Sequence, residues 1–93
     1  MIVKWHRQAR QDLRQVRASI AKENPKAAAR SAGRILQAVG RLSENPWIGR
    51  PGRVIDTREL AVSGTPYLIP YTVADDAVVI LRVLHEAQQW PGP

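Results

Sequence analysis

The residues in this sequence that are best suited to chemistry lie in one apolar stretch near its end, VVILRVLHEAQQWP, at residues 78–91. A single arginine, Arg82, interrupts this stretch, and its apolar part ends at His85. A third candidate, Arg58, begins an earlier stretch in which residue types alternate. Arginine supplies a fixed positive charge for a phosphate, and imidazole gains or loses a proton near neutral pH. These three residues are therefore candidates for contacting a target or its phosphates.

Each of these residues also has a purely structural interpretation. The stem of Arg82 could pack along a sheet while its guanidinium pairs with Glu59 or Glu86, because a buried charge must be paired. His85 could be a strand-terminal imidazole bonded to backbone, and Arg58 an edge charge that discourages sheet-to-sheet pairing. Arg82 and His85 lie on opposite faces of a regular strand, so a shared site would require a bend or bulge at the strand end.

The length and charge of the chain indicate one domain, residues 1–93, with a strongly basic first half. The formal net charge is +6. Residues 1–42 carry ten Lys or Arg against two acids, a net +8, and residues 43–93 carry four Arg against six acids, a net −2. A positive field of this kind attracts polyanions or an acidic protein partner, although a plain solvated surface is the alternative.

The composition indicates neither a metal site nor a cofactor. The chain has no cysteine and only two histidines, which excludes a disulfide framework and leaves too few ligands for a zinc site. No apolar run approaches the roughly 20 residues that cross a membrane, and the N-terminus lacks the apolar core of a secretory signal. We expect a cytoplasmic protein that does not contact membranes.

Hydrophobic periodicity predicts a short strand at residues 2–5 followed by two helices. In the first helix, residues 7–23, apolar residues recur every three or four positions, and arginines form a second stripe about 100° around the helix. Asn24 and Pro25 mark a break and a restart, because Asn is a good N-cap and Pro is tolerated at the first helical position. The second helix, residues 25–42, therefore completes a hairpin.

After the helices the period changes from helical to alternating. Prolines and glycines predict a loop at residues 43–53, and alternation predicts strands at 57–62 and 67–73. Pro70 cannot donate to a ladder and must face a strand edge or a bulge. The last strand, 77–84, is apolar on both faces and is expected to be central. The fold class is therefore α+β, with a helical hairpin against an antiparallel sheet.

Three stretches in this order resemble the RelE/ParE superfamily, the toxins of bacterial type II toxin–antitoxin modules. They are NPWIGRPGRVIDTREL at 45–60, GTPYLIPYTV at 64–73 and VVILRVLHEAQQWP at 78–91, and the resemblance covers nearly the whole chain. It implies that the helical hairpin packs on a curved antiparallel sheet. It also implies a cognate antitoxin, often acidic in the segment that wraps the toxin, and a higher hetero-oligomeric complex. The charge of residues 1–42 suits such a partner.

The superfamily has two branches with different targets. RelE-like members cleave mRNA in the ribosome, and a RelE-like activity would make Arg58, Arg82 and His85 the catalytic residues, without a metal. Leu68 stands where RelE-like members often carry Arg, and the C-terminal tail has no tyrosine. The RVLH ending and the NP-x-x-GRPG loop look closer to the ParE branch, which blocks DNA gyrase. The resemblance therefore favours gyrase inhibition, with mRNA cleavage as the alternative.

Two sets of contact residues follow from the charge distribution and the resemblance. Tryptophans are enriched at interface hot spots, although loop and tail tryptophans also serve to cover a core edge. The expected target-binding residues are Arg50, Arg53, Arg58, Arg82 and Trp90. The expected antitoxin-binding residues are Arg10, Arg14, Arg17 and Arg34.

Overall fold

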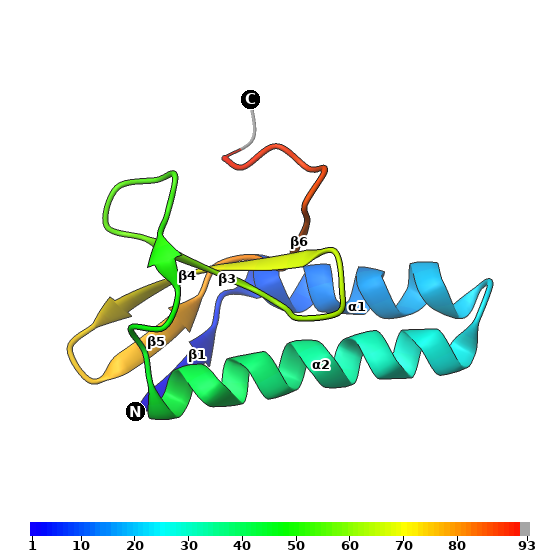
Figure 1. Cartoon of the computed structure of the whole chain (residues 1–93), viewed down its shortest axis with the longest axis horizontal. Helices are drawn as coiled ribbons and strands as arrows, with labels where there is room; N and C mark the ends of the chain where they lie inside the picture. Colours follow the sequence, from blue (N-terminus) through cyan, green and yellow to red (C-terminus); the bar gives the residue numbers. More distant parts are fainter. Residues whose placement is uncertain (92–93) are drawn as a thin grey trace.

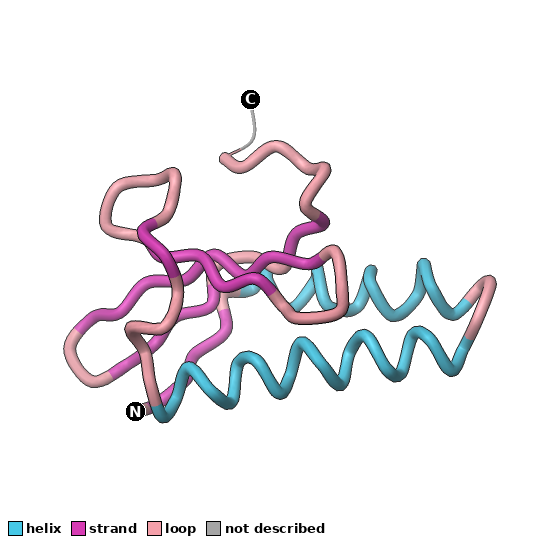
Figure 2. Tube along the Cα trace, in the orientation of Figure 1, coloured by secondary structure: helices cyan, strands magenta, loops and turns pink. Residues whose placement is uncertain are grey.

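The computed structural model describes residues 1–91 and has the predicted order of strand, two helices and strands (Figure 1). Figure 2 shows the two helices side by side on one side of the strands. The elements are β1 (Ile2–Trp5), α1 (Arg7–Ala21), α2 (Pro25–Glu44), β2 (Arg50–Pro51), β3 (Arg58–Ala61), β4 (Tyr67–Ala74), β5 (Ala77–Ile80) and β6 (Leu84–His85). The α+β fold class with a helical hairpin is confirmed.

Local side-chain contacts start both helices. At the first turn of α1 the His6 Nδ1 accepts a hydrogen bond from the Gln8 N–H at 3.1 Å. Asn24 caps α2 as predicted, because its Oδ1 accepts the Ala27 N–H at 3.1 Å and Pro25 occupies the first turn. No helix among residues 1–91 has both the length and the apolar character needed to cross a membrane.

The strands form one sheet in the order β1-β5-β4-β3-β2, with β6 paired to β4. The pairs β2–β3, β3–β4 and β4–β5 are antiparallel, as predicted for the C-terminal strands. β1 instead lies parallel to β5 at one edge of the sheet. A parallel neighbour requires a long crossover, and the helical hairpin together with the later strands supplies the chain that separates these two strands.

The single strand predicted at 77–84 is wrong, because the structure divides it into β5 and β6. The N–H groups of Leu81 and Arg82 both donate to the carbonyl of Pro70, at 2.9 and 3.5 Å. Pro70 has no N–H to return a bond, so the ladder is interrupted there. Of the two alternatives expected at Pro70, a strand edge or a bulge, the structure has the bulge. The loop predicted at 43–53 also contains the short strand β2, paired with β3.

Both faces of the sheet are covered. Ile69, Tyr71 and Ile80 pack with Ile35 and Leu42 of α2 in the core between sheet and helices. The other face is buried by the loop that carries β2 and by the C-terminal segment, which lie on the side of the sheet away from the helices (Figure 1). The buried side chains of this face include Glu59, Leu68, Pro70 and Leu84.

Candidate functional site

A buried carboxylate organises the segment that follows α2 and runs into the start of β3, residues 47–58, which we call the arginine loop. The Glu59 side chain is 1% exposed and lies 3.5 Å from the Arg50 guanidinium and 3.7 Å from that of Arg53. Its Oε2 also accepts the Arg53 backbone N–H at 2.9 Å. The two arginine side chains remain 65% and 47% exposed. Glu59 therefore holds two cations at the surface of the loop while its own charge is buried beneath them.

A buried tyrosine holds the start of the same loop. The Tyr71 hydroxyl donates to the Pro46 carbonyl at 2.8 Å and accepts the Gly49 N–H at 2.9 Å. A Cβ on Gly49 would lie 2.5 Å from the Tyr71 Oη and 2.9 Å from the Glu59 carbonyl oxygen, so only glycine fits. Burial raises the pKa of Tyr71 above its ordinary value, outweighing the lowering by the Gly49 hydrogen bond and the Arg58 charge. Tyr71 is therefore a neutral donor and acceptor.

The predicted residue Arg58 is bound to the loop that precedes it. Its Nη1 donates to the Gly49 carbonyl at 2.6 Å and to the Trp47 carbonyl at 3.3 Å. The guanidinium carbon also lies 5.0 Å from the centre of the Trp47 ring, within cation–π range. The two side chains contribute to the wall of an open surface hollow of about 450 Å³. The hollow is lined by Trp47, Pro51, Asp56, Thr57, Arg58 and Val73.

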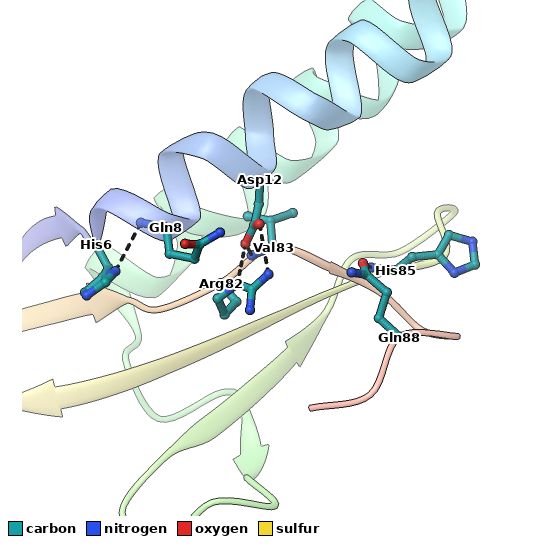
Figure 3. Close-up of polar contacts among 7 residues, drawn as sticks. All are labelled: His6, Gln8, Asp12, Arg82, Val83, His85 and Gln88. Carbon is teal, nitrogen blue, oxygen red and sulfur yellow. Dashed lines mark hydrogen bonds and ion pairs between the residues drawn. The ribbon is translucent and has the colours of Figure 1, made fainter. Parts of the chain in front are cut away.

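The partner of Arg82 is Asp12 on α1, and the pairing predicted with Glu59 or Glu86 is wrong. Arg82 donates from Nε at 2.7 Å and from Nη2 at 3.1 Å to the two carboxylate oxygens of Asp12 (Figure 3). The same carboxylate accepts the Val83 N–H at 2.9 Å. The hydrogen bond with Asp12 raises the pKa of Arg82, so the guanidinium stays charged. Asp12 thus joins α1 to the bulge between β5 and β6.

His85 has the purely structural role offered as an alternative, that of a strand-terminal imidazole bonded to backbone. The backbone N–H of His85 donates to the Gln88 Oε1 at 2.8 Å, and the imidazole Nδ1 accepts the Ala87 backbone N–H at 3.1 Å. The imidazole packs edge-on to the Tyr67 ring, with centroids 5.9 Å apart. Figure 3 shows the imidazole directed away from the Asp12–Arg82 pair.

The structure does not bring the three candidate catalytic residues together. Arg58 lies opposite Tyr71 on β4, and His85 lies opposite Tyr67, on the other edge of the same strand. Four residues of strand separate the two positions along β4 by about 13 Å, and the two strand spacings across it add about 10 Å. Arg82 turns instead toward α1. The bulge at Leu81 and Arg82 does not create the shared site that would have required one.

The four expected antitoxin-binding residues lie in two separate places on the surface. Arg10, Arg14 and Arg17 are exposed on α1, where they line a shallow groove of about 290 Å³ with apolar side chains. The apolar lining consists of Trp5, Leu13 and Leu36. Arg34 lies elsewhere, with its Nη1 donating to the Ser63 carbonyl at 3.1 Å in the turn between β3 and β4. The groove therefore presents three arginines along an apolar floor.

The last predicted contact residue, Trp90, is partly buried in the C-terminal segment, and among residues 1–91 its indole Nε1 has no hydrogen-bond partner. Sequence patterns did not single out Asp12, Glu59 or Tyr71 as organising residues. A signal existed for Asp12, because it is one of only two acids in residues 1–42 and lies beside the apolar stripe, on the side away from the arginines. Glu59 carried no comparable signal.

Comparisons with known proteins agree over nearly the whole chain. Residues 3–90 match the model of the family described as the ParE toxin of the type II toxin–antitoxin system parDE. The chain is 47% identical over 89 residues to the Y4kP protein of Sinorhizobium fredii, covering 96% of this chain and 92% of that protein. It is 41% identical over 86 residues to toxin RelE2 of Caulobacter vibrioides, covering 92% and 96%.

Two solved structures have the same fold. The chromosomal ParDE toxin–antitoxin system of P. aeruginosa matches with a TM-score of 0.83 and 28% identity, covering 91% of this chain and 95% of that chain. The RelBE2 toxin–antitoxin complex of Mycobacterium tuberculosis matches with a TM-score of 0.62 and 32% identity, covering 90% and 95%. Both likenesses cover at least 90% of this chain.

Proposed function

The chain belongs to the ParE family of toxins of type II toxin–antitoxin systems, and on that premise we propose that it arrests growth by binding DNA gyrase. The observation that supports binding over bond cleavage is the partnering of the ionisable candidates. Arg82 is held by Asp12, and Arg58 is bound to two loop carbonyls. Cleavage of RNA requires a proton acceptor, a proton donor and positive charge around one phosphate.

The arginine loop is the surface that best suits target binding. Arg50, Arg53 and Arg58 gather at one end of the sheet, with Trp47 beside them. Trp and Arg are the residue types most often found at interface hot spots. Arg82 contributes through the fold, since its side chain is only 26% exposed and its guanidinium joins α1 to the strand bulge through Asp12. A toxin that acts by docking needs such a surface and no assembled catalytic site.

The cognate antitoxin is the second proposed partner. Both structural matches are toxin–antitoxin systems, which supports such a partner for this chain. The groove on α1 suits an acidic amphipathic segment, because three arginines border apolar side chains that include Leu36, which is 44% exposed. We propose that this complex is a higher hetero-oligomer in the cytoplasm, where gyrase acts.

A supercoiling assay tests the proposed target. Purified toxin is titrated into DNA gyrase acting on relaxed plasmid, and toxin already bound to its antitoxin is the matched control. We expect loss of supercoiling with free toxin and full supercoiling with the complex. Unchanged supercoiling at saturating free toxin would contradict gyrase as the target.

The second candidate is ribosome-dependent mRNA cleavage. It is favoured by the 41% identity to toxin RelE2 and by the match to the RelBE2 complex. Mapping of mRNA ends after induction of the toxin separates the two candidates. New mRNA ends within codons, lost when Arg58 is replaced by Ala, would favour cleavage. A gyrase inhibitor would give the same mRNA ends in induced cells as in uninduced cells.

A further inference from the structure

The arginine loop carries the two most exposed large apolar side chains of the described residues. Ile55 is 85% exposed and Trp47 is 60% exposed. Single exposed apolar residues are ordinary on protein surfaces. Two of them on one short connection, beside an open hollow, form a surface feature that the burial of the core does not require. We call this arginine loop, residues 47–58, the Ile55 loop after its most exposed side chain.

The Ile55 loop is held in one conformation by hydrogen bonds within the chain. The Gly52 N–H donates to the Thr57 carbonyl at 2.8 Å, and the Thr57 hydroxyl donates to the Val54 carbonyl at 2.6 Å. Asp56 has a φ of 63°, in the left-handed region that Asp tolerates better than most residues. These bonds close a tight turn with Ile55 near its tip. An anchor fixed before binding loses little conformational entropy on association.

The charge of the loop differs from that of the chain around it. Residues 43–93 have a net charge of −2, yet three of their four arginines are Arg50, Arg53 and Arg58. The acidic partner of the first two, Glu59, is buried beneath them, so their positive charge faces solvent. The exposed acid of the loop is Asp56. The surface around Ile55 is therefore apolar at its centre and mainly cationic at its rim.

We propose that the Ile55 loop is a preformed docking element for a protein surface with an apolar recess and an acidic rim. Ile55 enters the recess, while Arg50 and Arg53 face the rim. An isoleucine tip favours a protein over a nucleic acid, because it can neither stack on a base as an aromatic ring does nor donate to a phosphate. The inference rests on the proposed function, since it places the contact with gyrase on this loop.

The docking element is separate from the arginine groove of α1. The loop rises on the side of the sheet away from the helices (Figure 1). It also lies at the β2 edge of the sheet, whereas Ile2 lies in β1 at the opposite edge. Ile2 is itself 57% exposed. It therefore offers a matched control, an exposed isoleucine on the same sheet that is remote from the loop.

The test compares Ile55→Ser with Ile2→Ser and the wild type. Both substitutions are at exposed positions, and thermal unfolding verifies that each variant is folded. Affinity for immobilised DNA gyrase is measured for the three proteins. We expect the dissociation constant to rise about tenfold or more for Ile55→Ser and to change less than about twofold for Ile2→Ser. Equal dissociation constants for all three proteins would overturn the docking element and leave the proposed function intact.

A second readout does not depend on gyrase. Growth arrest is measured after induction of each variant at matched protein levels. If the wild type does not bind gyrase, the proposed function fails, but selective loss of arrest by Ile55→Ser still supports docking on another protein. Equal arrest by Ile55→Ser and the wild type overturns the inference. It is also overturned if Ile55→Ser weakens binding of a labelled RNA or DNA oligonucleotide by the same factor, since the loop would then contact nucleic acid.

Discussion

Replacing Asp12 with Ala should remove the link between α1 and the bulge of the sheet. Asp12 is 10% exposed and accepts two hydrogen bonds from Arg82 and one from the Val83 N–H. A hydrogen bond to a charged group contributes about 1.5–3 kcal/mol, and an unsatisfied buried donor costs about 1–3 kcal/mol. The perturbation therefore leaves a cation and a backbone donor without their acceptor.

The partial exposure of Arg82 determines how much stability the Asp12→Ala substitution removes. The Arg82 side chain is 26% exposed, so in the variant water can accept some of the hydrogen bonds that the Asp12 carboxylate accepted from it. The pair therefore falls between an exposed ion pair, at about 0–1 kcal/mol, and a fully buried one, at about 3–5 kcal/mol when broken. We expect Asp12→Ala to lower the free energy of unfolding by about 2–3 kcal/mol. At this chain length the corresponding fall in Tm is about 10–20 °C.

Urea unfolding followed by circular dichroism at pH 7 measures this loss. Glu23→Ala is the control, an exposed acid in the turn between α1 and α2, and should change stability by less than about 0.5 kcal/mol. The double variant with Arg82→Ala should show a coupling energy of at least about 1 kcal/mol. A stable Asp12→Ala variant, or additive effects of the two substitutions, would refute the link. A folded Arg82→Ala variant should still arrest growth.

Three further predictions concern the loop. Gly49→Ala should cost about 1–3 kcal/mol in urea unfolding through its clash with Tyr71, whereas Gly40→Ala, with open space around it on α2, should add about 0.5–1 kcal/mol; equal effects would contradict the packing. Because burial raises the pKa of Tyr71 above 10.0, the unfolded chain ionises first and stability should fall above about pH 10. Tyr71→Phe, followed by Tm against pH, should lack this part of the loss. Glu59→Gln should speed tryptic cleavage after Arg53, seen by mass spectrometry, because the loop loses its ionic anchor; unchanged cleavage would show that the charge is dispensable.

The elements of the fold could be predicted from local patterns. The apolar stripes and the cap at Asn24 placed both helices, with ends that differ by about two residues from the structure. The strand predicted at 77–84 was wrong at its middle, because alternation of apolar side chains continues through a bulge and does not reveal which carbonyl lies opposite. Pro70 indicated a strand edge or a bulge, but only the pairing of strands showed that it is a bulge at Leu81 and Arg82.

The chemical inventory of the protein was determined by the sequence alone. The absence of cysteine, the basic first half and the concentration of arginines between Arg50 and Arg58 are properties of composition and order. The resemblance to the ParE family likewise lies in the residues of three short stretches, 45–60, 64–73 and 78–91. These features depend on residue identity and on spacing over a few turns or strand positions, which the chain itself encodes.

Only the tertiary structure decided which of these charges are free to act. Asp12 meets Arg82 across 70 positions of sequence, and Glu59 lies under the loop because β3 turns that side chain toward the face the loop covers. The energy of an ion pair depends on distance, geometry and burial, which follow from strand register and from where α1 lies on the sheet. No local pattern contains those quantities, so the partners of the arginines emerged only when the chain was folded.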